Sequence, residues 1–294
     1  MRLRKTAPSD IPALKELWKA AFSEKDEDIS DFFEMVYPTA MGFCAEEDGQ
    51  LAAMLYALPA VLAGGETESA FFAKSLKNAV LSEKKAAYIY AVATAEQHRR
   101  KGVCKKLMEF AEKELKKRYF SCVMLVPADE TLTEYYRKNG YLSKDGTKKL
   151  AAELRQGCGK AAADVAESIT AKPRQASGCA LGTAEYAGLR ETLLGDRLHV
   201  RYPKALLDYE EKRAALYRLE DGYALGCAAV RVEDGTAFVE ELLPDERMLP
   251  ALRAAVEAER FVWHRPGAGL MPAMEKWLDG TAPAEPVYLA FAFD

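Results

Sequence analysis

In each half of this chain the tripeptide Glu-Asp-Gly lies between two apolar runs, at residues 47–49 and at residues 220–222. An Asp-Gly pair in such a setting is a strong short-range signal for a β-hairpin. The patterns that follow the two hairpins are also alike, because each reads as a strand, a helix and a second strand. We therefore expect the two halves to be diverged copies of one structural unit.

Hydrophobic spacing and turn residues predict the order helix, hairpin, strand, helix, strand and helix for the first half. The first helix follows a Pro-Ser-Asp start signal at residues 8–10, and the last helix closes at the Asn139-Gly140 pair. The elements after the hairpin are expected at residues 88–93, 103–117 and 122–126.

The second half is expected to contain a helix at 182–194, the hairpin, a strand at 236–243, a helix at 248–259, a strand at 260–264 and a β-like end at 287–294. Residues from about 156 to 182 are rich in Gly, Ala and Ser, as a connection between modules often is. We predict an α/β (α+β) fold of two tandem modules, residues 1–155 and 156–294. Each module should hold a mixed, mostly antiparallel sheet flanked by helices.

Composition argues against several kinds of partner. The chain has 294 residues and a net charge of −4, whereas nucleic-acid-binding domains usually carry a basic excess, so we expect no nucleic acid partner. The six cysteines are scattered without a C-x-x-C pair, so reduced thiols in a cytoplasmic protein without a metal site are expected. No apolar run has the length of a membrane span, and no membrane partner is expected. The oligomeric state is open, with a homo-oligomer among the options.

Five cationic or His side chains surround Gly102, where the strand at 88–93 leads into the next helix: His98, Arg99, Arg100, Lys101 and Lys105. A helix start presents backbone N–H groups without partners, and glycine lets an anion approach them closely. A solvated helix start explains the cluster badly, because cations at a helix N-terminus oppose the helix dipole. A nucleic-acid surface is disfavoured by the glutamates on the same helix. We expect a cradle for a diphosphate.

These residues carry a resemblance to a known family. Residues 99–104 (RRKGVC) resemble the R-x-x-G-x-G/A pyrophosphate loop of GNAT-superfamily N-acetyltransferases. Residues 92–95 resemble the splayed fourth strand of that family, and residues 136–141 (YRKNGY) resemble its Y-x-K-x-G-F segment. The likeness covers roughly residues 1–150. The tandem layout is similar to that of the enhanced-intracellular-survival type of acetyltransferase.

The resemblance implies a role for each site residue. The backbones of Val92 and Thr94 would hold the thioester arm of the co-substrate acetyl-CoA, and Tyr136 would protonate the leaving thiolate. The pyrophosphate cradle would comprise Arg99, Arg100, Gly102, Val103 and Cys104. The implied activity is transfer of an acetyl group from acetyl-CoA to a primary amine of a small molecule, by direct attack and without a metal.

Two of these positions, and the matching segment of the second half, need an interpretation. Only Tyr136 lies at the spacing of the family from Gly140, which leaves the adjacent Tyr135 without a role. Cys104 stands where the family prefers Gly or Ala, and we interpret it as a small packing residue. In the second half, residues 244–246 (PDE) put acid where the phosphate would lie. The first module is therefore expected to be catalytic and the second to be degenerate.

The acceptor side is less well determined by the sequence. Residues 24–31 hold five carboxylates, which form either a solubilising loop or a surface that favours a cationic amine: Glu24, Asp26, Glu27, Asp28 and Asp31. Residues 87–92 (AYIYAV) hold no carboxylate, although many relatives carry a glutamate on this strand. The amine would then lose its proton through a water relay or to Asp294. The missing carboxylate keeps open a second function, that of a non-catalytic acyl-CoA-binding regulatory or structural protein.

Deleting the last two residues tests the role of Asp294. If its carboxylate takes the proton of the amine, the deletion should lower turnover and leave the affinity for acetyl-CoA unchanged. Steady-state kinetics and calorimetric titration measure the two quantities separately. Unchanged turnover in the shortened chain would exclude Asp294 as the base.

Overall fold

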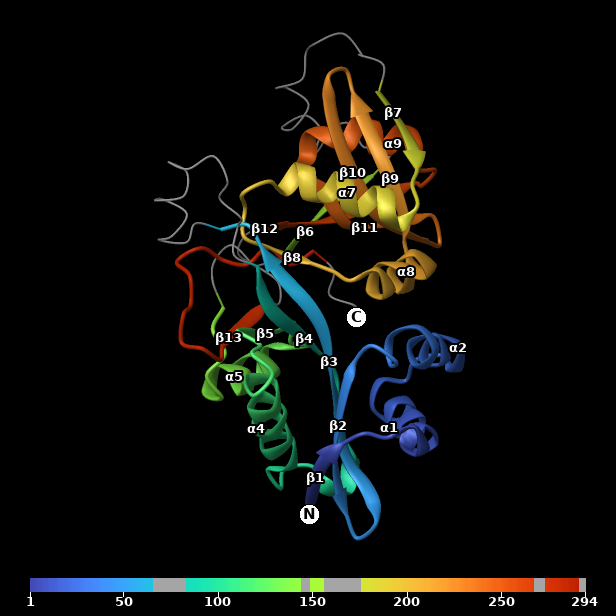
Figure 1. The fold of residues 1–294 in the computed structure, drawn as a ribbon. Helices are drawn as coiled ribbons and strands as arrows, with labels where there is room; N and C mark the ends of the chain where they lie inside the picture. The colour runs from blue at the N-terminus through green and yellow to red at the C-terminus, as the bar shows by residue number, and fades with distance from the viewer. Residues whose placement is uncertain (66–82, 144–148, 156–175, 267–272, 291–294) are drawn as a thin grey trace.

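Two mixed β-sheets form the fold and lie one above the other in Figure 1. The computed structural model describes residues 1–65, 83–143, 149–155, 176–266 and 273–290. The first sheet has the order β1-β2-β3-β4-β5-β13, and β8 extends it by pairing with β3. Its strands are β1 (Arg2–Lys5), β2 (Met41–Glu47), β3 (Gln50–Ala63), β4 (Lys84–Thr94), β5 (Cys122–Leu125), β8 (His199–Arg201) and β13 (Met274–Trp277).

The second sheet has the order β6-β12-β11-β10-β9-β7. In each sheet one pair of the described strands is parallel, β4 with β5 and β11 with β12, and the other pairs are antiparallel. This shared pattern confirms the predicted fold of two related α/β modules. The strands are β6 (Lys149–Arg155), β7 (Ala176–Ala180), β9 (Ala215–Asp221), β10 (Ala224–Glu233), β11 (Thr236–Leu243) and β12 (Arg260–Pro266).

Strands cross between the two halves of the chain in both directions. β6 follows the first module along the chain, yet it pairs with β12 of the second sheet. β13 lies near the end of the chain, yet it pairs with β5 of the first sheet, with Met274 opposite Leu125. β8 also comes from the second half and pairs with β3 of the first sheet. Each sheet is therefore completed by strands from the other half of the chain.

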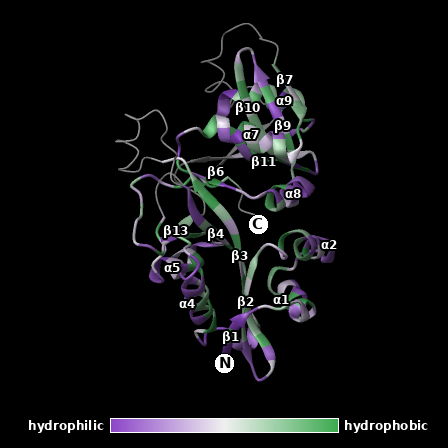
Figure 2. Ribbon diagram, in the orientation of Figure 1, coloured by the Kyte–Doolittle hydropathy of each residue, from purple (hydrophilic) through white to green (hydrophobic). Residues whose placement is uncertain are grey.

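Helices cover both faces of the first sheet (Figure 1). On one face, α1 packs through Leu14, Leu17 and Trp18, which recur at helical spacing. On the other face, α4 packs through a stripe that includes Val103 and Leu107. Figure 2 shows hydrophobic residues along β3 and mixed colours on these helices. The helical segments are η1 (Pro8–Asp10), α1 (Ile11–Phe22), α2 (Asp26–Asp31), η2 (Phe32–Val36), η3 (Glu96–His98), α4 (Val103–Lys116), α5 (Glu130–Lys138), α7 (Thr183–Leu194), α8 (Lys204–Arg213), η5 (Glu246–Met248) and α9 (Leu249–Ala255).

Both predicted hairpins are confirmed. Between β2 and β3, Asp48 has a φ of 52° and Gly49 a φ of 78°, the two positive values that a type I′ turn needs. Gly222 has a φ of 63° between β9 and β10. A strand is expected at 287–294, but within residues 287–290 the β-structure is a single isolated bridge between Tyr288 and His199. Residues 291–294 lie outside the described residues.

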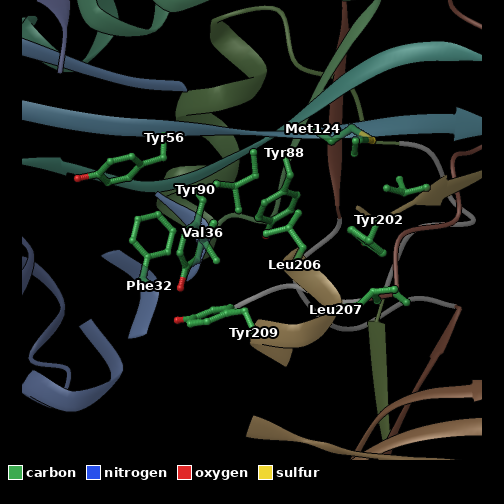
Figure 3. Packing of buried hydrophobic residues seen from close by; sticks show 14 of the residues in the cluster. Phe32, Val36, Tyr56, Tyr88, Tyr90, Met124, Tyr202, Leu206, Leu207 and Tyr209 are labelled. Atoms are coloured by element: carbon green, nitrogen blue, oxygen red, sulfur yellow. The ribbon is translucent and has the colours of Figure 1, made fainter. Parts of the chain in front are cut away.

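One hydrophobic core runs through both modules. Phe32 of η2 packs edge-on against Tyr209 of α8, with ring centroids 6.2 Å apart, and against Tyr56 of β3 at 5.0 Å. Figure 3 shows these rings together at the place where α8 meets the first sheet. At the end of α8, Lys212 Nζ lies 2.6 Å from Oδ1 of Asp31. The second module therefore covers the α1–α2 face of the first.

A buried ion pair fixes the junction between the modules. Nε of Arg190 on α7 donates to both carboxylate oxygens of Glu241 on β11, at 3.0 Å each. Arg190 Nη1 also donates to the carbonyl oxygen of Val200 at 2.7 Å, on the strand β8 that pairs with β3. Removing one partner of such a pair typically costs about 3–5 kcal/mol, because the other charge stays buried. The pair thus links α7 and the second sheet to the first sheet.

A chain that ends at Arg155 should not fold cooperatively by itself. It would lack β13, which pairs with β5, and α8, which covers Phe32. We expect no sharp thermal transition by circular dichroism and strong binding of a dye for exposed apolar surface, whereas the full chain should unfold in one step. A cooperative transition of the short chain at the melting temperature of the full chain would contradict this expectation.

Candidate cofactor-binding site

β4 carries a bulge at the position where the sequence predicts the site. Its register with β3 shifts between Tyr90 and Ala93, so that Ala91 and Val92 oppose one residue of β3. Ala91 has a positive φ of 48°, which is uncommon for a residue other than glycine. A bulge takes local backbone groups out of the regular ladder and bends the strand. The backbone of Val92 is placed at this bend.

β4 separates from β5 before the bulge. The parallel pairing of the two strands covers residues 86–88 and 122–124, although β4 continues to Thr94. Within the described ranges, no strand pairs with this edge of β4 after Tyr88. An unpaired edge presents N–H and C=O groups that an extended ligand can bind as an added strand would. The edge is open along the segment that holds Val92 and Thr94.

The start of α4 lies next to this open edge. Gly102 is the N-cap residue, with a left-handed φ of 75°, and Arg100 before it has a φ of 60°. No side chain caps the first turn, and a Cβ built on Gly102 would meet no atom within 4 Å. The first turn of α4 therefore keeps its backbone N–H groups free of a side-chain cap, and the space beside Gly102 is open, which are the features of a helix start that binds anions.

The predicted cradle residues come together at this helix start. Nε of Arg99 donates to the carbonyl oxygen of Thr94 at 3.1 Å, which ties the loop to the end of β4. Arg99 and Arg100 are exposed, so both guanidinium groups are available to an anion. Val103 is buried beneath the loop and anchors the first turn of α4 in the core. A diphosphate with several oxygens fits this set of donors.

Cys104 lies in the first turn of α4, beside the hydroxyls of Tyr135 and Thr94. Burial raises the pKa of its thiol above the usual range. Little thiolate therefore forms at neutral pH, and the thiolate is the reactive form. This result supports the interpretation of Cys104 as a packing residue.

Tyr136 lies on α5, with its ring buried under the same end of the sheet. The ring packs edge-on against Tyr135 at a centroid distance of 5.3 Å and against Tyr141 at 5.5 Å. Burial raises the pKa of the Tyr136 hydroxyl, and the nearby Cys104 raises it further. The hydroxyl therefore keeps its proton at neutral pH, as a proton donor must.

The carboxylates of residues 24–31 mostly hold the helices together. Glu24 Oε2 accepts a hydrogen bond from the indole nitrogen of Trp18 at 3.0 Å, and Asp26 pairs with Lys19 at 2.7 Å. Asp31 forms the contact with α8 described above. The solubilising-loop interpretation is therefore incomplete, because three of these side chains have structural partners. Asp294 lies outside the described residues.

The second module brings one residue to this region that the sequence did not suggest. Tyr209 of α8 is hydrogen-bonded to Tyr90, the residue of β4 directly before the bulge. Figure 3 shows the two hydroxyl groups pointing toward each other. The two residues are far apart in the sequence, and no local pattern could have paired them.

The helix start of the second module differs from that of the first. Asp245 precedes η5, and its Oδ1 accepts a hydrogen bond from the backbone N–H of Arg247 at 3.0 Å. The side chain of Arg247 also pairs with this carboxylate at 2.6 Å. The carboxylate of Asp245 thus lies in the connection between β11 and α9, and α9 begins at Leu249 with Pro250, which has no backbone N–H, in its first turn.

Two further features bear on the kinds of ligand. Among the described residues, no three His, Cys, Asp or Glu side chains come together in a way that could hold a metal ion. In the same part of the chain, no helix combines the length and the apolar character needed to cross a membrane.

Comparison with known proteins gives a match to a family model within the first module and a likeness of fold over the whole chain. Residues 11–141 match the sequence model of the acetyltransferase (GNAT) family. No curated protein matches the chain. A GCN5-related N-acetyltransferase from Kribbella flavida is 17% identical, with a TM-score of 0.65 over 95% of this chain and 72% of that one.

Two other solved structures share the two-module architecture. Eis1 from Mycobacterium abscessus is 12% identical, with a TM-score of 0.65 over 95% of this chain and 74% of that one. A tandem GNAT protein from the clavulanic acid biosynthesis pathway is 11% identical, with a TM-score of 0.56 over 96% of this chain and 99% of that one. At these identities the likeness concerns the fold.

Substitution of Gly102 by alanine tests the cradle, and Gly49 offers a matched control. Both glycines have a positive φ, 75° and 78°, and both have open space around the added Cβ. Each alanine should cost about 1–2 kcal/mol in free energy of unfolding. Only Gly102→Ala should weaken coenzyme A binding, by roughly tenfold, the effect of losing one charge-assisted hydrogen bond. Chemical denaturation and calorimetry measure the two effects, and equal affinities of the two variants would exclude the cradle.

Proposed function

Because residues 11–141 match the model of the acetyltransferase (GNAT) family, whose members use acetyl-CoA as co-substrate, we propose that this protein acetylates the primary amine of a small cationic molecule. The family determines the enzyme class, acetyl-CoA-dependent N-acetyltransferase, and the acceptor is our proposal. The observation that supports the proposed acetyl transfer best is that β4 separates from β5 beside the open, glycine-capped start of α4.

The described residues fit acetyl-CoA. The backbone amides at the start of α4, with Arg99 and Arg100, offer donors to its pyrophosphate. The open edge of β4 at Val92 and Thr94 offers backbone groups to its extended arm. When bound, acetyl-CoA supplies the activated acetyl group. The residues of the chain then need to orient an amine, polarise a carbonyl and provide one proton.

Tyr136 is the proposed donor of that proton. It is buried close to the end of β4 and keeps its proton at neutral pH, for the reasons given above. A positioned acid of this kind typically contributes 10²–10⁴-fold to the rate.

The proton of the amine must leave on the side of the acceptor. Along β4, residues 84–94 hold no carboxylate, so the base has to come from another element or from water. Tyr288, near the end of the chain, is held at the junction of the modules: its N–H donates to Leu198 O at 2.9 Å, and its carbonyl accepts from Val200 N at 3.0 Å. We propose Asp294 or a water relay as the route for this proton.

A cationic acceptor is supported by the charges around Tyr209. Burial raises the pKa of the Tyr209 hydroxyl, and the negative charges of Glu24 and Asp28 raise it further, whereas Arg213 lowers it. Glu24 and Asp28 lie at the end of α1 and on α2, which pack on the face of the first sheet opposite α4. An ammonium group would be attracted to these carboxylates.

Thiol release from acetyl-CoA, followed with a panel of polyamines, aminoglycosides, amino acids and peptides, tests the acceptor class. We expect kcat/KM to be highest for an acceptor with several positive charges and to fall as salt screens the attraction. Equal values for cationic and neutral amines would contradict the proposed acceptor and leave the enzyme class intact.

Substitution of Tyr136 by phenylalanine tests the proton donor. The ring and its packing are kept, so the melting temperature should stay close to that of the parent protein. We expect kcat to fall by about 100-fold or more, with coenzyme A binding unchanged. Turnover at the parent rate would show that the thiolate obtains its proton elsewhere.

The absence of a carboxylate on β4 also favours one second candidate, a protein that binds acyl-CoA without catalysis. It predicts tight binding of coenzyme A and no turnover with any amine of the panel. The same pair of experiments therefore separates the two functions.

A further inference from the structure

We propose that Tyr135 donates a hydrogen bond from its hydroxyl group to the pantetheine arm of coenzyme A. The sequence leaves this residue without a role, because Tyr136 is the one at the spacing of the family. The inference rests on the proposed function, since it requires the cradle at Gly102 to hold the pyrophosphate.

The hydroxyl of Tyr135 is buried and lacks a hydrogen-bond partner of normal geometry among the described residues. A buried tyrosine hydroxyl usually finds a partner, because burial without one carries a desolvation cost. Its polar neighbour is the Cys104 thiol, which is only a weak acceptor. The packing of the ring against Tyr136 needs no hydroxyl, and phenylalanine would serve it equally well.

The position of the hydroxyl indicates which part of the ligand it meets. Cys104 contacts both Tyr135 and Thr94, and it lies two residues after Gly102. Thr94 lies two residues after Val92 on the open edge of β4. A linker that joins a pyrophosphate at the start of α4 to a thioester at the bulge must pass this group of side chains.

The pantetheine arm has the acceptor groups that the Tyr135 hydroxyl could bind. A pantetheine arm carries two amide groups, whose carbonyl oxygens are good acceptors. Burial and the neighbouring thiol raise the pKa of Tyr135, so the hydroxyl stays protonated and acts as a donor. The arm would then give the hydroxyl a carbonyl acceptor, which is stronger than the thiol of Cys104 beside it.

Calorimetric titration with two ligands tests the inference. Coenzyme A contains the arm, whereas ADP has the pyrophosphate and lacks the arm. In Tyr135→Phe, the affinity for coenzyme A should fall about 3- to 10-fold, as expected for one hydrogen bond, and the affinity for ADP should not change. The melting temperature should not fall, because the variant loses only an unpartnered group.

One variant serves as a control. Tyr223→Phe removes a hydroxyl from a side chain that is 99% exposed, and it should change neither affinity.

The remaining outcomes are equally decisive. Parent-like affinity of Tyr135→Phe for coenzyme A would overturn the inference and leave the proposed function standing. An equal loss of affinity for coenzyme A and ADP would place the hydroxyl at the pyrophosphate and contradict its assignment to the arm. Failure of the parent protein to bind coenzyme A would overturn the cradle itself, and the role of Tyr135 with it.

Discussion

The site depends on how early the parallel pairing of β4 and β5 ends. The two strands pair at 86–88 and 122–124, and after that the bulge at Ala91 and Val92 bends β4. Because β4 remains paired with β3 on its other side, the strand stays in the sheet while one edge opens. The glycine-capped start of α4 lies beside that edge, and Arg99 ties the two together. An anion site and an unpaired strand edge are thereby held next to each other by the core of the first module.

The second module supports this arrangement from two directions. β13 pairs with β5 on the edge away from β4, and α8 packs against the rings on the α1–α2 face. The ion pair between Arg190 and Glu241 fixes β8, which extends the first sheet from β3. The exchange of β6 and β13 makes the two sheets interdependent. The second module thus contributes to the stability of the first sheet and packs against its α1–α2 face.

Local patterns in the sequence predict the helices, the strands and the cradle. They do not predict which distant strands pair with each other. The hairpin at Asp48-Gly49, the helix after Gly102 and the apolar strand β5 follow from turn chemistry and hydrophobic period, which act over a few residues. The partners of β6 and β13 do not, because a strand of given pattern can join either sheet. The contact of Tyr209 with Tyr90 and the unpartnered hydroxyl of Tyr135 likewise depend on segments that meet only in the folded chain.

The central claim is that the start of α4 is an open cradle and that the corresponding segment of the second module, from η5 to the start of α9, is not. Gly102 precedes α4 with a left-handed φ and open space beside it, whereas Asp245 pairs with Arg247 ahead of α9, and Pro250 leaves the first turn of α9 with one backbone N–H fewer. The stoichiometry of coenzyme A binding, measured by isothermal titration on the full chain, tests this claim most directly. We predict one coenzyme A per chain. Two sites per chain, or none, would contradict the claim.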